Sequence, residues 1–202
     1  MNRVVFIYIG ILFTVLASLT GLVTIPERQL GGLQPVTGAD GRPYPVQPTG
    51  QVAEGRQVYI AEGCIYCHSQ QVRPKGFGAD FERGWGDRRT VARDYIYDAP
   101  PLLGTMRTGP DLANIGVRQP SDNWHYLHLY NPRITSPGSI MPPFPFLFEE
   151  IPVQVEVPAD ALKFPPGWEK PGFAIVPNRR ARALVAYLKS LDHSHPVPEV
   201  PR

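Results

Sequence analysis

The residues best able to do chemistry in this sequence are Cys64, Cys67 and His68, which lie together in the stretch CIYCH. They include both cysteines of the chain. A C-x-x-C pair alone can be a redox dithiol, which would follow a strand in a β-α-β pattern, or part of a zinc site, which usually takes four protein ligands. With a histidine directly after the second cysteine, the same spacing is the attachment signal for c-type haem.

The surroundings of this motif favour haem attachment. The preceding segment, residues 51–63, has a helical rather than a strand pattern, and the chain has no second cysteine pair to complete a zinc site. The two thiols would form thioethers with the haem vinyl groups while the histidine reaches the iron. We therefore expect one covalently bound haem c, held by Cys64 and Cys67, with His68 as an axial ligand.

The other side of the haem iron needs a second axial ligand or stays open. The candidates are the methionines and histidines outside the motif, namely Met106, Met141, His125, His128, His193 and His195. Met141 lies in the stretch SIMPPFPFL, and flanking prolines fix a loop at little entropic cost. We expect Met141 to be the ligand and Met106 to fill a gap in the core, the commoner role of methionine. A His/Met pair closes the iron site and suits electron transfer.

A membrane anchor is the clearest feature outside the motif. Residues 4–25 carry no charge and would form a helix about 33 Å long, enough to cross a hydrocarbon core about 30 Å thick. A cleaved signal peptide is the alternative, but its apolar region is usually only about 7–15 residues long and ends at a small-residue cleavage site. No clear site of that kind follows here, so we expect residues 1–25 to be a retained transmembrane anchor.

The rest of the chain is expected to be one small all-α domain at the end of a stalk. Residues 26–50 are rich in proline and glycine and predict the stalk, residues 51–192 the domain, and residues 193–202 a solvated tail with His193 and His195. The net charge of +2 gives no strong attraction to nucleic acid, and the hydrophobic fraction of 43% is enough for a core.

Two helices and one hairpin are predicted within this domain. The first helix covers about a dozen residues and ends near Gly63; the second has Asn178 as its N-cap and an apolar face of Ala181, Leu184, Val185, Leu188 and Leu191. Residues 149–177 contain an alternating run at Val153, Val155 and Val157 and a second apolar run at 173–176. This pattern predicts a small β-hairpin insertion, and our hypothesis for its role is a docking surface.

Four stretches carry a more specific resemblance. GRQVYIAEGCIYCHSQQVRP, YDAPPLLGTMRTGPDLANIG, DNWHYLHLYNPR and MPPFPFL occur in this order, and the last helix, RRARALVAYLKSL, adds to them. Together they resemble the membrane-anchored monohaem subunit of cbb3-type cytochrome c oxidases. The resemblance implies a class I cytochrome c-like domain, with Cys64 and Cys67 holding the haem, His68 as the proximal ligand and Met141 as the distal ligand.

The resemblance also implies roles for residues near the haem. A Gly-Pro-x-Leu segment passes beside the proximal histidine in proteins similar to class I cytochromes c, and residues 109–112 match it. The Pro110 carbonyl would then accept a hydrogen bond from the second ring nitrogen of His68. Two roles remain open for His125 and His128, which share a helix face, and for Arg73 and Arg133. These four side chains would either contact haem propionates or partner subunits, or occupy ordinary core or surface positions.

The function implied is that of an electron-transfer subunit. It would relay electrons to haem b and the haem–copper centre of a large catalytic subunit, which reduces O2, whereas this chain has no O2-reducing centre. A second c-type cytochrome subunit or a soluble cytochrome c would be the donor. We expect a single-pass protein of the bacterial inner membrane, with the haem domain on the outer, periplasmic side, contact with lipid and no nucleic-acid partner. The alternatives are the monohaem subunit of a nitric oxide reductase and a freestanding membrane-tethered cytochrome c shuttle.

Overall fold

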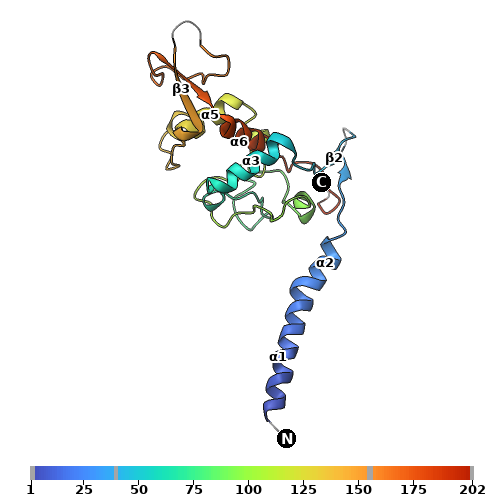
Figure 1. Ribbon diagram of the computed structural model, residues 1–202. Helices are drawn as coiled ribbons and strands as arrows, with labels where there is room; N and C mark the ends of the chain where they lie inside the picture. Colours follow the sequence, from blue (N-terminus) through green and yellow to red (C-terminus); the bar gives the residue numbers. More distant parts are fainter. Residues whose placement is uncertain (1–2, 39–40, 154–156, 201–202) are drawn as a thin grey trace. The chain divides into compact units, whose positions relative to one another are not determined.

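The computed structural model describes residues 3–38, 41–153 and 157–200 and is mostly helical. The chain divides into two compact units (Figure 1). Residues 1–46 and 91–96 form the first unit, and residues 47–90 and 97–202 form the second. Each unit is therefore built from segments that are separated in the sequence.

The first unit begins with one long helical segment. Helix α1 (Arg3–Leu19) continues through a π-helical turn, η1 (Thr20–Thr24), into α2 (Ile25–Leu30), for 28 residues in total. Pro26 explains the π-turn, because proline has no N–H and its ring clashes with the carbonyl group four residues earlier. The Ile25 N–H instead bonds to the Thr20 carbonyl, five residues back. The segment is long and apolar enough to cross a membrane, and its membrane-crossing window packs against no other part of the described chain.

The predicted stalk contains more regular structure than its composition indicated. The helix runs five residues beyond Ile25, and β1 (Val36–Thr37) pairs antiparallel with β2 (Pro43–Tyr44). The short 3-10 helix η3 (Ala92–Tyr95) belongs to the same unit. The Tyr44 hydroxyl donates to Asp94 Oδ1 at 2.8 Å. The proline and glycine content of the stalk did not predict this regular structure. The structure depends on contacts with residues about fifty positions away in the sequence.

The second unit is built around two crossing helices, α3 (Gly50–Ala61) and α6 (Arg179–Ser190) (Figure 1). Gly55 lies at the crossing, where a Cβ atom would be 1.8 Å from the Ala183 carbonyl oxygen. Only glycine lets the two backbones approach so closely. The aromatic rings of Tyr59 and Tyr187 meet edge to face beside this crossing, with centroids 5.5 Å apart.

Both helices agree with the sequence prediction. Helix α3 ends two residues before Gly63, and the Asn178 side chain caps α6 by accepting a hydrogen bond from the Ala181 N–H. The predicted apolar face of α6 is fully buried: Ala181, Leu184, Val185, Leu188 and Leu191. This face is the centre of the core, to which the shorter helices α4 (Ile115–Arg118) and α5 (Asp122–Tyr130) also contribute.

The predicted hairpin exists, but its first strand lies earlier in the sequence than expected. Strand β3 (Phe148–Pro152) pairs antiparallel with β4 (Phe173–Pro177), with Phe148 opposite Pro177. The alternating valines at 153 and 157 come after β3, and Val155 lies outside the described residues. Phe148 sets the register, because its buried ring packs edge to face against Tyr126 and Tyr130 of α5.

Three short 3-10 helices complete the second unit. They are η2 (Cys64–Tyr66), η4 (Pro132–Ile134) and η5 (Pro145–Leu147). Between them run long irregular connections, as the 24 prolines of the sequence indicate. The first of these 3-10 helices contains the first cysteine of the motif, and the segment between the other two contains Met141.

Candidate haem site

The CIYCH motif lies directly after the end of α3. Gly63 leaves the helix in the left-handed conformation (φ 71°), which glycine adopts without strain, and η2 follows at once. The His68 N–H donates to the Cys64 carbonyl oxygen at 2.9 Å, so a single turn brings the cysteine and the histidine together. Cys64 is half-buried against the core, whereas Cys67 is exposed. The local sequence thus forms a tight turn that contains both cysteines and the histidine.

The imidazole of His68 is held on two sides. Its Nδ1 lies 2.7 Å from the Pro110 carbonyl oxygen, which is the hydrogen bond that the resemblance implied. A carbonyl oxygen can only accept, so Nδ1 carries the proton and the lone pair is on Nε2. Gly109 lies against the ring, and a Cβ atom there would be 2.3 Å from Cε1. The ring orientation and tautomer are therefore fixed, and the lone pair of Nε2 is left available for a ligand.

The electrostatics of the cysteines argue against a redox dithiol. Burial, with a smaller effect of Glu62, raises the pKa of the Cys64 thiol to about 12. Reactive C-x-x-C dithiols instead have a cysteine whose pKa is lowered, usually by a helix N-terminus or a nearby cation. Here the motif follows the C-terminal end of α3, where the helix dipole offers no such help.

The donor set also argues against a zinc site. Within residues 3–38, 41–153 and 157–200, no group of three or more His, Cys, Asp or Glu side chains is placed to hold a metal ion. Two thiols and one imidazole with an oriented Nε2 fit covalent haem attachment instead, because that chemistry needs the thiols for the macrocycle and only one histidine for the iron.

Met141 lies in a loop that is fixed at several points. The side chain is half-buried and packs against the hydrophobic core. Its N–H donates to Ser139 Oγ at 3.2 Å, and its carbonyl oxygen accepts from Arg133 Nη1 at 3.1 Å. Three residues later, the Phe144 N–H donates to the Leu129 carbonyl oxygen at 2.8 Å. Arg133 therefore holds the backbone of the predicted distal ligand.

The expected core position of Met106 is wrong. Its side chain is 57% exposed. It follows Gly104, whose positive φ of 79° turns the chain and brings its Cα against the backbone of His68 and Ser69. Gly104, rather than Met106, therefore makes the close contact with the backbone of His68 and Ser69. The side chain of Met106, two residues later, points towards the solvent.

The two histidines of α5 are hydrogen-bonded inside the domain. His125 is 2% exposed and its Nε2 lies 2.8 Å from the Gln119 carbonyl oxygen. His128 Nδ1 lies 2.6 Å from Thr135 Oγ1, and its ring stacks on Trp124 at 4.8 Å. Burial lowers the pKa of both rings, to about 4 for His128, where the neighbouring histidines add to the effect.

The C-terminal tail differs from the prediction at one histidine. His193 is buried, and its backbone N–H donates to Asn114 Oδ1 at 2.7 Å. Asn114 also donates through Nδ2 to the Trp85 carbonyl oxygen at 2.8 Å, so one buried amide joins the tail to a distant loop. His195 is partly exposed, with Nε2 3.3 Å from Asp192 Oδ2. This packing could not be predicted from the sequence, because the tail itself is rich in proline and polar residues.

A network of charged groups lies close to His68 and was not predicted from the sequence. Asp80 and Asp111 are 1% and 0% exposed, and Arg107 contacts both of them. The sequence left two roles for Arg73, a contact with haem or another subunit and an ordinary surface position. In the structure Arg73 donates to Asp80 through Nη2 at 2.8 Å. Nothing in the local sequence marks Asp80, which lies in the polar, glycine-rich stretch KGFGADFERG, as buried.

Comparison with known protein families shows which family the chain belongs to. A family model described as "Cytochrome C oxidase, mono-heme subunit/FixO" matches residues 2–164. The chain belongs to this family. No match was found among curated protein sequences. The resemblance inferred from the sequence is thus confirmed, and the match favours neither a nitric oxide reductase subunit nor a freestanding shuttle.

Membership in the monohaem subunit family has three consequences. The chain is a subunit of an oxidase complex, so its partner is the catalytic subunit. It is associated with one haem, and with a membrane through the apolar helix at its N-terminus. The matched residues include CIYCH, Pro110 and Met141, whereas β4 and α6 lie beyond the matched span.

Proposed function

We propose that this monohaem subunit holds one haem c covalently and passes electrons through it to haem b and the haem–copper centre of the catalytic subunit, which reduces O2. The observation that carries the proposal is the 2.7 Å hydrogen bond from His68 Nδ1 to the Pro110 carbonyl oxygen, with Gly109 against the same ring. It leaves Nε2 as the ligating atom, in a turn that also contains two thiols.

Each site residue has a distinct task in this proposal. Cys64 and Cys67 would hold the macrocycle through thioether bonds, and His68 and Met141 would be the proximal and distal ligands of the iron. The Pro110 carbonyl increases the basicity of the imidazole by accepting its proton partly. A haem with this His/Met pair takes up and releases one electron, and both axial positions are closed to O2.

The domain would be a class I cytochrome c-like fold that spans residues 51–192. The crossing of α3 and α6 supports this proposal, because it places the CIYCH turn at the end of a helix anchored in the core. The donor of electrons would be a second c-type cytochrome subunit or a soluble cytochrome c. The hairpin of β3 and β4 offers exposed side chains such as Trp168 and Phe173 as a docking surface.

The apolar helix would hold the domain on the outer, periplasmic side of the bacterial inner membrane. C-type haem is attached on that side, so the N-terminus would be inside. The 28-residue segment Arg3–Leu30 is about 42 Å long at roughly 1.5 Å per residue, which exceeds a hydrocarbon core of about 30 Å. Its last turns would then reach the interface, where Glu27 and Arg28 lie. Tethering gives the domain a high effective concentration at its partner.

Purification of the assembly tests this proposal. The full-length chain, tagged and extracted in mild detergent, should bring the haem–copper subunit with it. It should also carry a haem that stays bound under denaturing electrophoresis and is lost in the double variant Cys64→Ala/Cys67→Ala. Recovery of the wild-type chain alone, without the haem–copper subunit, would contradict the subunit role. Haem that dissociates on denaturation would contradict covalent attachment.

A further inference from the structure

Two segments are joined side by side at the candidate haem site. The Gly109 N–H donates to the Cys67 carbonyl oxygen at 2.9 Å, and the next pair of residues forms the His68–Pro110 hydrogen bond. One step further, Ser69 Oγ donates to Asp111 Oδ2 at 2.6 Å. Ser69 follows His68 and Asp111 follows Pro110, so the residues next to the His68–Pro110 pair are themselves joined by a hydrogen bond. The position of the Pro110 carbonyl group therefore depends on the Ser69–Asp111 hydrogen bond.

Arg107 reaches across both segments. Its Nε donates to Ser69 Oγ at 2.9 Å, its Nη2 donates to the Gln71 carbonyl oxygen, and its Nη2 lies 3.7 Å from Asp111 Oδ2. Its Nη1 donates to Asp80 Oδ1. Only 18% of the Arg107 side chain is exposed, and each nitrogen of its guanidinium group faces a protein oxygen. The arginine is thus committed to the interior of the domain rather than to a binding surface.

Asp80 and Asp111, the carboxylates that contact Arg107, are themselves held by further hydrogen bonds. Asp111 accepts from two backbone N–H groups at 2.8 Å, those of Gln71 and Ala113. Asp80 accepts from the Arg73 N–H at 2.8 Å and from the Arg73 guanidinium group. Buried carboxylates with this many donors cannot follow a displaced arginine without leaving hydrogen bonds unmade, which is costly.

We infer that Arg107 is a positioning residue for the proximal ligand. The inference rests on the proposed function. Arg107 touches neither His68 nor Pro110 but fixes Ser69 and lies against Asp111, the two residues that hold the Pro110 carbonyl in place under Nδ1. A guanidinium group can do this because its donors form a rigid planar fork, whereas the ammonium group of a lysine is a single point charge.

The inference predicts a direction for the reduction potential. A looser Pro110 carbonyl accepts the Nδ1 proton less fully, so the imidazole donates less electron density to the iron. The ferric state is then less stabilised and the potential rises. Arg107→Lys is the informative change, because it keeps the positive charge and removes only the fork. A neutral replacement would add an opposing effect, since loss of a cation lowers the potential.

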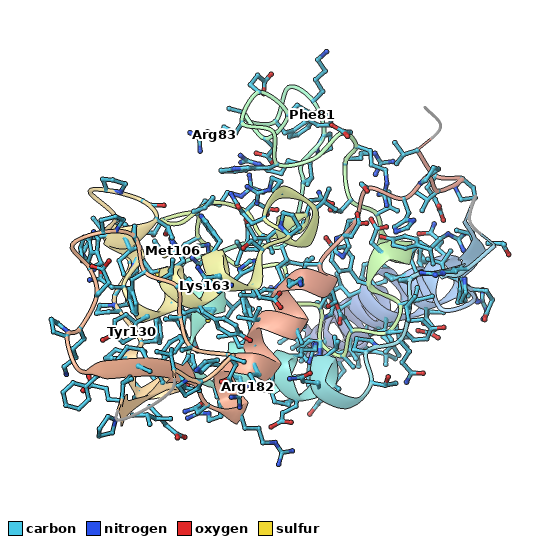
Figure 2. The ribbon with its side chains drawn as sticks, turned by 90° about the horizontal axis from the view of Figure 1, so that it is seen from above. Phe81, Arg83, Met106, Tyr130, Lys163 and Arg182 are labelled. Carbon is cyan, nitrogen blue, oxygen red and sulfur yellow. The ribbon has the colours of Figure 1, made fainter. Side chains whose placement is uncertain are left out.

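The test compares Arg107→Lys with Arg83→Lys in the full-length haem-loaded chain in detergent. Arg83 is a matched control: both guanidinium groups lie over the ring of Trp85, at 5.0 and 5.2 Å, but Arg83 is exposed and points out of the loop that carries Phe81 (Figure 2). We expect the Nδ1 proton of His68 in Arg107→Lys to exchange with deuterium at least about tenfold faster than in wild type, with a higher potential. Arg83→Lys should match wild type in both.

Two outcomes separate this inference from the proposed function. A wild-type chain without a His/Met haem would overturn the proposed function and the inference with it. A normal wild-type chain in which Arg107→Lys matches Arg83→Lys in exchange and potential would overturn the inference alone. If Arg107→Lys does not fold, Asp80→Asn replaces it, because it removes the charge that holds Nη1. Faster Nδ1 exchange in that variant supports the inference, and unchanged exchange overturns it.

Discussion

Gly109 lies directly against the ring of His68, so closely that a Cβ atom at this position would be 2.3 Å from Cε1 and 2.7 Å from Nδ1. The same ring donates to the carbonyl oxygen of the next residue, Pro110. The dipeptide Gly109–Pro110 therefore sets both the position and the rotation of the imidazole ring. Residue 109 has to be glycine for the Pro110 carbonyl oxygen to reach Nδ1.

Gly109→Ala should therefore displace the imidazole. The methyl group would push the ring away from Pro110, at a cost of about 1–3 kcal/mol from overpacking. We expect a lower fraction of chains with covalently bound haem and a lower thermal unfolding temperature. Haem content per chain and a melting curve would check this. Gly32→Ala is the control, because nothing lies within 4 Å of a Cβ atom there. Equal haem content in the two variants would contradict the close contact.

Met141→Ala should remove the proposed distal ligand. We expect loss of the methionine–iron absorption band at the red end of the spectrum and a sharp fall in potential, because methionine ligation raises the potential. Met106→Ala is the matched control, since its side chain is exposed, and it should retain both properties. Absorption spectra and a redox titration decide the matter. Loss of the band in Met106→Ala with its retention in Met141→Ala would exchange the two assignments.

Arg133→Ala should weaken the proposed ligation by Met141 without abolishing it. The Arg133 guanidinium group donates to the Met141 carbonyl oxygen, so its loss frees the loop at one of its fixed points. We expect the methionine–iron band to survive at neutral pH and 25 °C but to disappear at a lower temperature than in wild type during heating. Arg180→Ala is the control, because that arginine pairs with Glu62 instead. Identical thermal profiles of the band would show that Arg133 has no such role.

Gly55→Ala should destabilise the second unit, because the added methyl group would meet the Ala183 carbonyl oxygen at the crossing of α3 and α6. Overpacking at a backbone contact costs about 1–3 kcal/mol, more than the small gain in helix propensity. Denaturant unfolding, followed by circular dichroism, measures the difference. Gln57→Ala, at an exposed position of the same helix, should be close to neutral. A neutral Gly55→Ala would mean that the two helices can separate slightly at no cost.

Asp80 should make the domain sensitive to acid. Burial acts to raise the pKa of Asp80, but Arg73 and Arg107 outweigh it and lower the pKa to about 2. The folded-state pKa lies below the unfolded value of about 3.9, so this stabilisation is complete above pH 4 and is lost as the pH falls towards 2. The difference in unfolding free energy between wild type and Asp80→Asn should shrink over that range. Glu82→Gln, an exposed change in the same loop, is the control.

The sequence alone determined the elements whose signals are local. The apolar run of the anchor, the Asn178 cap, the face of α6 and the CIYCH spacing each lie within about twenty residues, where helix periodicity and haem chemistry leave few choices. The family resemblance added the pairing of His68 with Pro110, and the structure has that hydrogen bond.

Only the tertiary structure decided which polar groups are buried and where strands are in register. The β3 strand was predicted at the alternating valines, but Phe148 packs against α5 and fixes the pairing earlier in the sequence. His193 and Asp80 are nevertheless buried, because Asn114 accepts from the backbone N–H of His193 and Arg107 donates to Asp80 from distant segments. A buried polar group is stable only when such partners are present, and sequence patterns do not reveal contacts between distant segments.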